Sequence, residues 1–253
     1  MEFPRRSVAA NVRALLEILA LLSVICLTCL IGYRMYRDSA LPFAAAPRPL
    51  RGPAEGASAK AAPLPREPFS IEGGTVKGNP AAKIAVVEFA DFQCPYCSRF
   101  ARETLPGLEE RYLETGRVQF VFMHFPLVGI HPLAQRAAAG SMCAGHQGRF
   151  WEMHDRLFAQ PTRDNLLALD GHASALGLNR RQFDACLDAA ATAKRIERDT
   201  ATAKVLGVRG TPTFFVGEVV GKDRVRAVGR VTGGQSLGGF ERILTTLLNE
   251  AGR

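Results

Sequence analysis

Apolar and polar positions divide the chain into an apolar run near its start, a polar stretch, and a long patterned region. Residues 14–33 are apolar apart from Glu17, Thr28 and a few small residues. A helix of this length spans about 30 Å, the thickness of a bilayer's hydrocarbon core. A cleaved secretory signal is the alternative, but Arg34 and Arg37 follow the run where a cleavage site needs small residues. The pattern therefore favours one transmembrane helix that acts as an anchor.

The segments on either side of this run lack an apolar period. Residues 1–13 form a short N-terminal tail with three arginines. Residues 34–70 are rich in proline and alanine, which is typical of a semi-extended linker. We therefore expect the folded domain to occupy residues 71–253, held away from the membrane by the linker.

The pattern inside residues 71–253 alternates between strand and helix signals. Two short β-branched runs predict buried strands, and alanine-rich stretches with a helical period predict helices. In chain order the expected elements are a strand at 83–90, a helix at 95–114, a strand at 117–125, a helical block at about 131–206, a strand pair at 213–217 and 225–229, and an amphipathic helix at 236–250. This order predicts an α/β fold with a helical insertion.

Composition and charge narrow the functional classes. The chain is 47% hydrophobic and 22% charged, as in ordinary globular proteins, so a sizeable core can form. The formal net charge is +8, but lysine and arginine are spread along the chain without a dense basic run. We therefore expect no nucleic-acid partner.

The cysteines point to the chemistry. Cys94 and Cys97 form a C-x-x-C with Pro95 and Tyr96 between them, at the predicted start of a helix. Unpaired N–H groups and the helix dipole stabilise a thiolate there, and the thiolate is the form that attacks a disulfide. The spacing brings Cys97 close enough to bond Cys94, so the pair is a candidate redox centre. Cys26 and Cys29 lie in the apolar run, where packing is the favoured interpretation.

A zinc site is the competing interpretation of a C-x-x-C. It needs a second pair of ligands at suitable spacing, and the five histidines show no metal-binding pattern. His124 ends a strand beside the motif, but we expect it to be an ordinary packed or surface residue. We therefore expect no metal and no bound cofactor, because the disulfide itself is the redox group.

Cys143 and Cys186 lie in predicted helices of the insertion. They are either a second, structural disulfide or two buried free thiols. A bond between them would close a loop of about 43 residues and stabilise the domain by a few kcal/mol.

A second motif carries a family resemblance. Gly210-Thr211-Pro212-Thr213 precedes the strand FFVG, and AVVEFADFQCPYCSRF and GRFWEMHDRLF frame the first motif and the insertion. Together they resemble the thioredoxin superfamily, and the long insertion resembles its DsbA-like branch. The resemblance implies that Cys94 is the exposed nucleophile and Cys97 the buried resolving cysteine. It implies that Pro212 is a cis-proline facing the pair and that Thr211 offers its backbone to an extended substrate.

Glu88 lies six residues before Cys94, at the position of the buried acid in such proteins. The resemblance implies that Glu88 relays a proton to or from Cys97; the alternative is a solvated carboxylate at the end of a strand. The middle pair Pro95-Tyr96 and the residue Thr211 both differ from the best-known strong oxidases of the branch. These differences leave the direction of electron flow open.

These observations predict a membrane-anchored, extracytoplasmic thiol–disulfide oxidoreductase. The favoured activity is a dithiol oxidase at the outer side of the cytoplasmic membrane. Its partners would be cysteine-containing exported proteins and a membrane redox protein. The alternatives are a disulfide isomerase or reductase of the same compartment, and a peptide-binding or chaperone module without turnover.

Overall fold

The computed structural model describes residue 23 and residues 26–34 and 63–251. The chain divides into two compact units, residues 1–59 and 60–253. In the first unit, residues 26–34 are helical. Within the described ranges, no helix combines the length and the apolar character needed to cross a bilayer. The predicted tail at 1–13 and most of the 14–33 run and of the linker lie outside the described residues.

The second unit is built on one six-stranded sheet. Its order is β1-β6-β5-β3-β4-β2, with β3 and β4 parallel and every other neighbouring pair antiparallel. The strands are β1 (Phe69–Ser70), β2 (Thr75–Gly78), β3 (Ile84–Ala90), β4 (Val118–His124), β5 (Thr213–Val220) and β6 (Arg224–Thr232).

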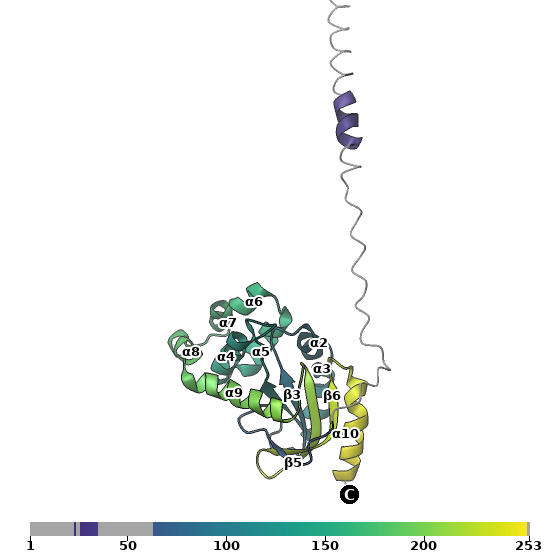
Figure 1. Ribbon diagram of the computed structural model, residues 1–253, viewed down its shortest axis with the longest axis vertical. Helices are drawn as coiled ribbons and strands as arrows, with labels where there is room; N and C mark the ends of the chain where they lie inside the picture. Colours follow the sequence, from purple (N-terminus) through teal and green to yellow (C-terminus); the bar gives the residue numbers. More distant parts are fainter. Residues whose placement is uncertain (1–22, 24–25, 35–62, 252–253) are drawn as a thin grey trace, which may run out of the picture. The chain divides into compact units, whose positions relative to one another are not determined.

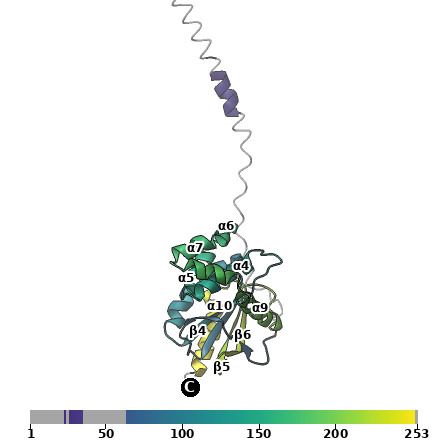
Figure 2. The same cartoon turned by 90° about the vertical axis from the view of Figure 1, so that its left-hand side faces the viewer.

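Helices connect and cover the strands. The first group follows β3 and consists of α2 (Pro95–Glu103), α3 (Leu105–Leu108) and the π-helix η1 (Glu109–Leu113). The insertion between β4 and β5 consists of α4 (Ala134–Gly145), α5 (Phe150–Ala159), α6 (Arg163–Leu167), α7 (Leu169–Ala175), α8 (Arg180–Leu187) and α9 (Ala190–Val205). Helix α10 (Leu237–Ala251) closes the domain. Figure 1 and Figure 2 show α4–α7 gathered at one end of the sheet.

Alternate residues of the central strands pack on opposite faces of the sheet. On one face, Phe120 and Phe214 contact Phe100 of α2, and Phe214 contacts Phe240 of α10. On the other face, strand residues such as Phe215 form a smaller core with Ala203 of α9. Both faces of β3 and β4 are covered, which explains why these strands are continuous apolar runs.

The structure confirms the predicted α/β fold with a helical insertion and differs from the expected elements in three places. The helix predicted at 95–114 is divided into α2, α3 and η1. Pro106, which cannot donate a backbone hydrogen bond, accounts for the break between α2 and α3. Residues 75–78, for which the sequence predicted no element, form β2, which pairs with β4. The end of the predicted linker forms β1, which pairs with β6.

Candidate active site

Cys94 is the N-cap residue of α2, directly after the short loop that follows β3. Pro95 occupies the first turn, where a missing N–H costs no helical hydrogen bond. Cys94 and Cys97 are unbonded thiols in this structure. Cys97 is fully buried, as expected. Cys94 is only 4% exposed, so the expectation that the nucleophile is exposed is wrong. The Thr211–Pro212 segment contacts Cys94 and contributes to this burial.

The surroundings of Cys94 and Cys97 shift the pKa values of their thiols in opposite directions. A hydrogen bond from the Cys97 side chain lowers the pKa of Cys94 to about 6, and burial opposes this shift. The Thr211 side chain and hydrogen bonds from the backbone N–H groups of Tyr96 and Cys97 add to the lowering. Burial, followed by the interaction with Cys94, raises the pKa of Cys97 well above that of an ordinary thiol. The pair therefore has one acidic thiol at the helix start and one that holds its proton.

The loop before β5 forms the wall opposite the pair. The peptide bond between Thr211 and Pro212 is cis. The Cys94 thiol donates to the Thr211 carbonyl at 3.2 Å, which places the two motifs of the sequence in direct contact. The Thr211 hydroxyl is buried and helps to lower the pKa of Cys94, but it makes no hydrogen bond of ordinary geometry among the described residues.

Glu88 lies within β3 and is 1% exposed, so it is the buried acid rather than a solvated strand end. Burial raises the pKa of Glu88 well above that of an ordinary carboxyl, and the charge of Cys94 adds to this shift. Within residues 63–251, its Oε1 atom has no hydrogen-bond partner. The charge of Glu88 also raises the pKa of Cys97, so the two groups are close enough to interact electrostatically.

Asp91 is a residue of the site that the sequence analysis did not single out. Its buried carboxylate accepts hydrogen bonds from the backbone N–H groups of Gln93 at 2.7 Å and Leu127 at 2.8 Å, and contacts His131 Nδ1 at 2.8 Å. Its carbonyl accepts from the Cys94 N–H at 3.0 Å. Asp91 thus fixes the loop that delivers Cys94 to the helix start. The sequence does carry a signal for this role, because Asp91 is an acidic residue directly after a buried strand.

Tyr96 is the exposed member of the motif. Its residue exposure is 42%, and the Arg99 guanidinium lies 5.7 Å from the centre of its ring. Tyr96 therefore offers an apolar surface beside Cys94 to an approaching molecule.

His124 is a packed core residue. Its ring contacts Phe92 and Phe122, and burial lowers its pKa to about 3, so it is neutral at physiological pH. Among the residues that the structure describes, no three histidine, cysteine or acidic side chains come together as a metal site requires.

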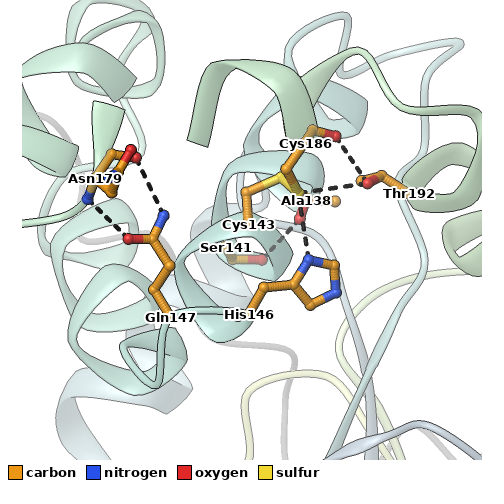
Figure 3. The surroundings of a disulfide bond; sticks show 8 residues. All are labelled: Ala138, Ser141, Cys143, His146, Gln147, Asn179, Cys186 and Thr192. Carbon is orange, nitrogen blue, oxygen red and sulfur yellow. Dashed lines mark hydrogen bonds between the residues drawn. A yellow bond between two sulfur atoms is a disulfide. The ribbon is translucent and has the colours of Figure 1, made fainter. Parts of the chain in front are cut away.

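Cys143 and Cys186 form a disulfide that joins α4 to α8. Figure 3 shows its surroundings: His146 Nδ1 and Thr192 Oγ1 each lie 3.5 Å from Cys186 Sγ. Asn179 and Gln147 exchange two hydrogen bonds nearby and also link the two helices. The second pair of cysteines therefore braces the insertion and stands apart from the Cys94–Cys97 pair.

Comparison with solved structures agrees with this geometry. Alpha-DsbA1 of Wolbachia pipientis is 26% identical with a TM-score of 0.63, and the match covers 76% of this chain and 96% of that one. A thioredoxin-like oxidoreductase from Silicibacter pomeroyi DSS-3 is 26% identical with a TM-score of 0.59, covering 70% and 92%. BdbD of Bacillus subtilis, at 23% identity and a TM-score of 0.58, covers 75% and 98% and shares the fold.

Curated relatives match only over part of their length. The protein named Na(+)/H(+) antiporter NhaA 1 of Salinispora arenicola is 38% identical over 149 residues, which is 59% of this chain and 22% of that protein. The protein named Na(+)/H(+) antiporter NhaA of Herminiimonas arsenicoxydans is 35% identical over 160 residues, 62% of this chain and 25% of that protein. The chain thus spans about a quarter or less of these relatives, and their names describe those longer proteins.

The family comparison covers most of the second compact unit. Residues 70–227 match the family described as thioredoxin, a range that includes both cysteine pairs and the cis-proline. The chain therefore belongs to the thioredoxin family, and it resembles alpha-DsbA1 and the thioredoxin-like oxidoreductase among the solved structures.

Proposed function

We propose that this protein is a dithiol oxidase that transfers the Cys94–Cys97 disulfide to cysteine-containing exported proteins. The observation that carries the proposal is the position of Cys94 at the start of α2 against the cis Thr211–Pro212 segment, where the pKa of its thiol falls to about 6. A stabilised thiolate favours the reduced form of the pair, which makes its disulfide a stronger oxidant. Such a thiolate is also a good leaving group when the substrate is released.

The reaction proceeds in two exchanges. A substrate thiolate attacks Cys94 Sγ, the Cys94–Cys97 bond breaks, and Cys97 leaves with the electron pair. Glu88, whose pKa is raised by burial, protonates the buried Cys97 sulfur. A second substrate thiolate then attacks the substrate sulfur of the mixed disulfide and releases the Cys94 thiolate. The substrate loses two electrons, and the cysteine pair gains them.

The Thr211–Pro212 wall gives the substrate a place to bind. The Thr211 carbonyl lies 3.2 Å from Cys94 Sγ, so an extended peptide that pairs with this segment would present its cysteine to Cys94. Tyr96 would contact the neighbouring apolar side chains of the peptide.

The compartment and the partners belong to the same proposal. Disulfides such as Cys143–Cys186 persist mainly outside the cytoplasm, which favours an extracytoplasmic domain. The apolar run at 14–33 would anchor that domain on the outer side of the cytoplasmic membrane. A membrane redox partner would accept the two electrons and restore the Cys94–Cys97 disulfide.

The test is the reduction potential of the Cys94–Cys97 pair in glutathione buffers, together with the oxidation of a reduced, unfolded substrate protein. An oxidase should have a potential clearly above about −200 mV, whereas a value near thioredoxin's, about −270 mV, would contradict the proposal and favour a reductase. Efficient shuffling of scrambled disulfides would favour an isomerase. Full cellular activity of a Cys94→Ser variant would favour a peptide-binding module without turnover.

A further inference from the structure

The short loop between β6 and α10 contacts both walls of the active site. Its first three residues, Gly233, Gly234 and Gln235, form the segment called the 233–235 loop. The Gly233 N–H donates to the Pro212 carbonyl at 2.8 Å. At the other end, the Gln235 carbonyl accepts a hydrogen bond from the Thr104 hydroxyl at 2.9 Å. The loop is thus tied to the cis-proline segment on one side and to the end of α2 on the other.

Gly234 is the point of closest approach to the cysteine motif. A Cβ atom at position 234 would lie 2.9 Å from the Tyr96 carbonyl oxygen, nearer than real Cβ contacts occur. The obstacle is backbone within the first turn of α2, not the flexible end of a side chain, so it cannot simply rotate away. Only glycine lets the loop approach the motif this closely.

We propose that the 233–235 loop is a spacer that sets the gap between the start of α2 and the Pro212 segment, and that Gly234 is its positioning residue. A side chain at 234 must either push the loop outward or tilt the first turn of α2. The first movement strains the Gly233–Pro212 hydrogen bond, and the second moves the Tyr96 peptide.

Both movements change the contacts of the reactive sulfur, Cys94 Sγ. Cys94 Sγ is held between the Thr211 carbonyl on one wall and the N–H groups of Tyr96 and Cys97 on the other. A change in the gap therefore alters the N–H contacts that stabilise the thiolate and the Thr211 carbonyl contact that accepts from the neutral thiol. The inference rests on the proposed function only in assuming that Cys94 is the exchanging group.

The test compares Gly234→Ala with Gly238→Ala in the full-length chain. Gly238 is a matched control, because a Cβ there meets nothing within 4 Å. The readouts are the titration of the Cys94 thiolate by its ultraviolet absorbance and the equilibrium constant with glutathione. We expect Gly234→Ala to raise the Cys94 titration midpoint by about half a pH unit, a roughly threefold change in the ionisation constant. The glutathione equilibrium constant should change at least as much, and Gly238→Ala should match wild type in both.

Identical titrations and equilibrium constants in a folded Gly234→Ala protein would overturn the inference, and so would equal shifts in both glycine variants. If Gly234→Ala does not fold, Thr104→Val replaces it, because this change removes the second anchor of the loop without adding bulk. Its control is Thr246→Val, whose hydroxyl bonds only within α10 among the described contacts. A folded Thr104→Val protein with an unshifted titration would then reject the spacer role. A wild-type protein that fails to exchange with glutathione would refute the oxidoreductase mechanism and not the spacer role alone.

Discussion

Cys94 and Cys97 share one turn of α2, yet the pKa values of their thiols shift in opposite directions. The largest cause at Cys94 is the hydrogen bond from Cys97, so the second cysteine activates the first before it resolves any disulfide. Burial supplies the largest part of the shift at Cys97. Cys94 is therefore the reactive thiol because it lies at the helix start, and Cys97 keeps its proton because it is buried beneath that start.

This division predicts the pH dependence of alkylation. In the reduced protein, the rate of reaction of Cys94 with iodoacetamide should reach half its maximum near pH 6, because the pKa of Cys94 is about 6. A Cys97→Ala variant loses the main hydrogen bond to the thiolate, so its midpoint should move toward that of an ordinary thiol. Mass spectrometry of the alkylated protein measures both profiles, and Cys94→Ser is the control. A wild-type midpoint near pH 9 would contradict the assignment.

The free energy of unfolding of the reduced protein should also depend on the ionisation of Cys94. The pKa of Cys94 is lower in the folded protein than in the unfolded chain, so the folded state binds fewer protons between the two values. The resulting stabilisation of the reduced protein is present above the pKa of an ordinary thiol and is lost as the pH falls through about 6. Denaturant unfolding of reduced wild type and reduced Cys94→Ser should therefore show a difference that grows from pH 6 to pH 9. A constant difference would rule out a depressed pKa.

Glu88 supports a separate prediction about the buried step. Glutamine has the size of glutamate but carries no exchangeable acid proton, so Glu88→Gln should slow the exchange step that protonates or deprotonates Cys97. General acid–base catalysis contributes about 100-fold or more, and a loss of at least tenfold is expected. Stopped-flow measurement of mixed-disulfide formation and decay checks this. The Cys94 alkylation midpoint serves as the control, because it should move much less than the rate.

At the scale of elements, the second disulfide acts as a brace. Cys143 lies in the last turn of α4 and Cys186 in the last turn of α8, where the helix dipole disfavours a thiolate. Cys94 lies at a helix start, where the helix dipole stabilises a thiolate instead. The Cys143–Cys186 bond should therefore resist reduction under conditions that open Cys94–Cys97.

Its loss should affect stability rather than chemistry. A Cys143→Ser/Cys186→Ser double variant should unfold with a free energy lower by about 2–4 kcal/mol, as expected for a loop of this size. The Cys94 titration should stay unchanged, since the Cys143–Cys186 bond is not among the groups that shift its pKa. Denaturant unfolding and thiolate titration measure the two effects. A variant of unchanged stability would show that hydrogen bonds such as Asn179–Gln147 already hold the helices together.

The elements also show where sequence reasoning succeeds. The strands at 84–90 and 118–124 lie within one residue of the predicted ranges, because strands buried on both faces are continuous apolar runs. Strand β2 was missed because its four residues, which follow Gly74 and end in Gly78, lie at the sheet edge and have no apolar period of their own. The two motifs predicted the contact of Cys94 with the Thr211 segment. The role of Asp91 depends on backbone partners at 93 and 127, which only the folded chain brings together.

At the scale of the whole molecule, the folded part can be separated from the predicted anchor. Both hydrophobic cores are formed by residues between Phe69 and Leu248, all within the unit 60–253. A fragment of residues 60–253 should therefore fold alone and exchange with glutathione at the rate of the full chain. An unfolded fragment, or a folded one with a changed exchange rate, would show that residues 1–59 contribute to the domain.

The same pair of proteins tests the anchor and the compartment together. In bacterial cells, the full-length chain should stay with the membranes after a carbonate wash, because the apolar run at 14–33 is long enough to span them. The 60–253 fragment, which lacks that run, should be soluble and remain in the reducing cytoplasm. Thiol titration under denaturing conditions should then find Cys143 and Cys186 bonded in the full-length chain and reduced in the fragment, since cytoplasmic thiols are kept reduced.

Release by the carbonate wash together with a shortened N-terminus would instead identify 14–33 as a cleaved signal. A full-length chain with reduced Cys143 and Cys186 would place the domain in the cytoplasm and refute the proposed orientation.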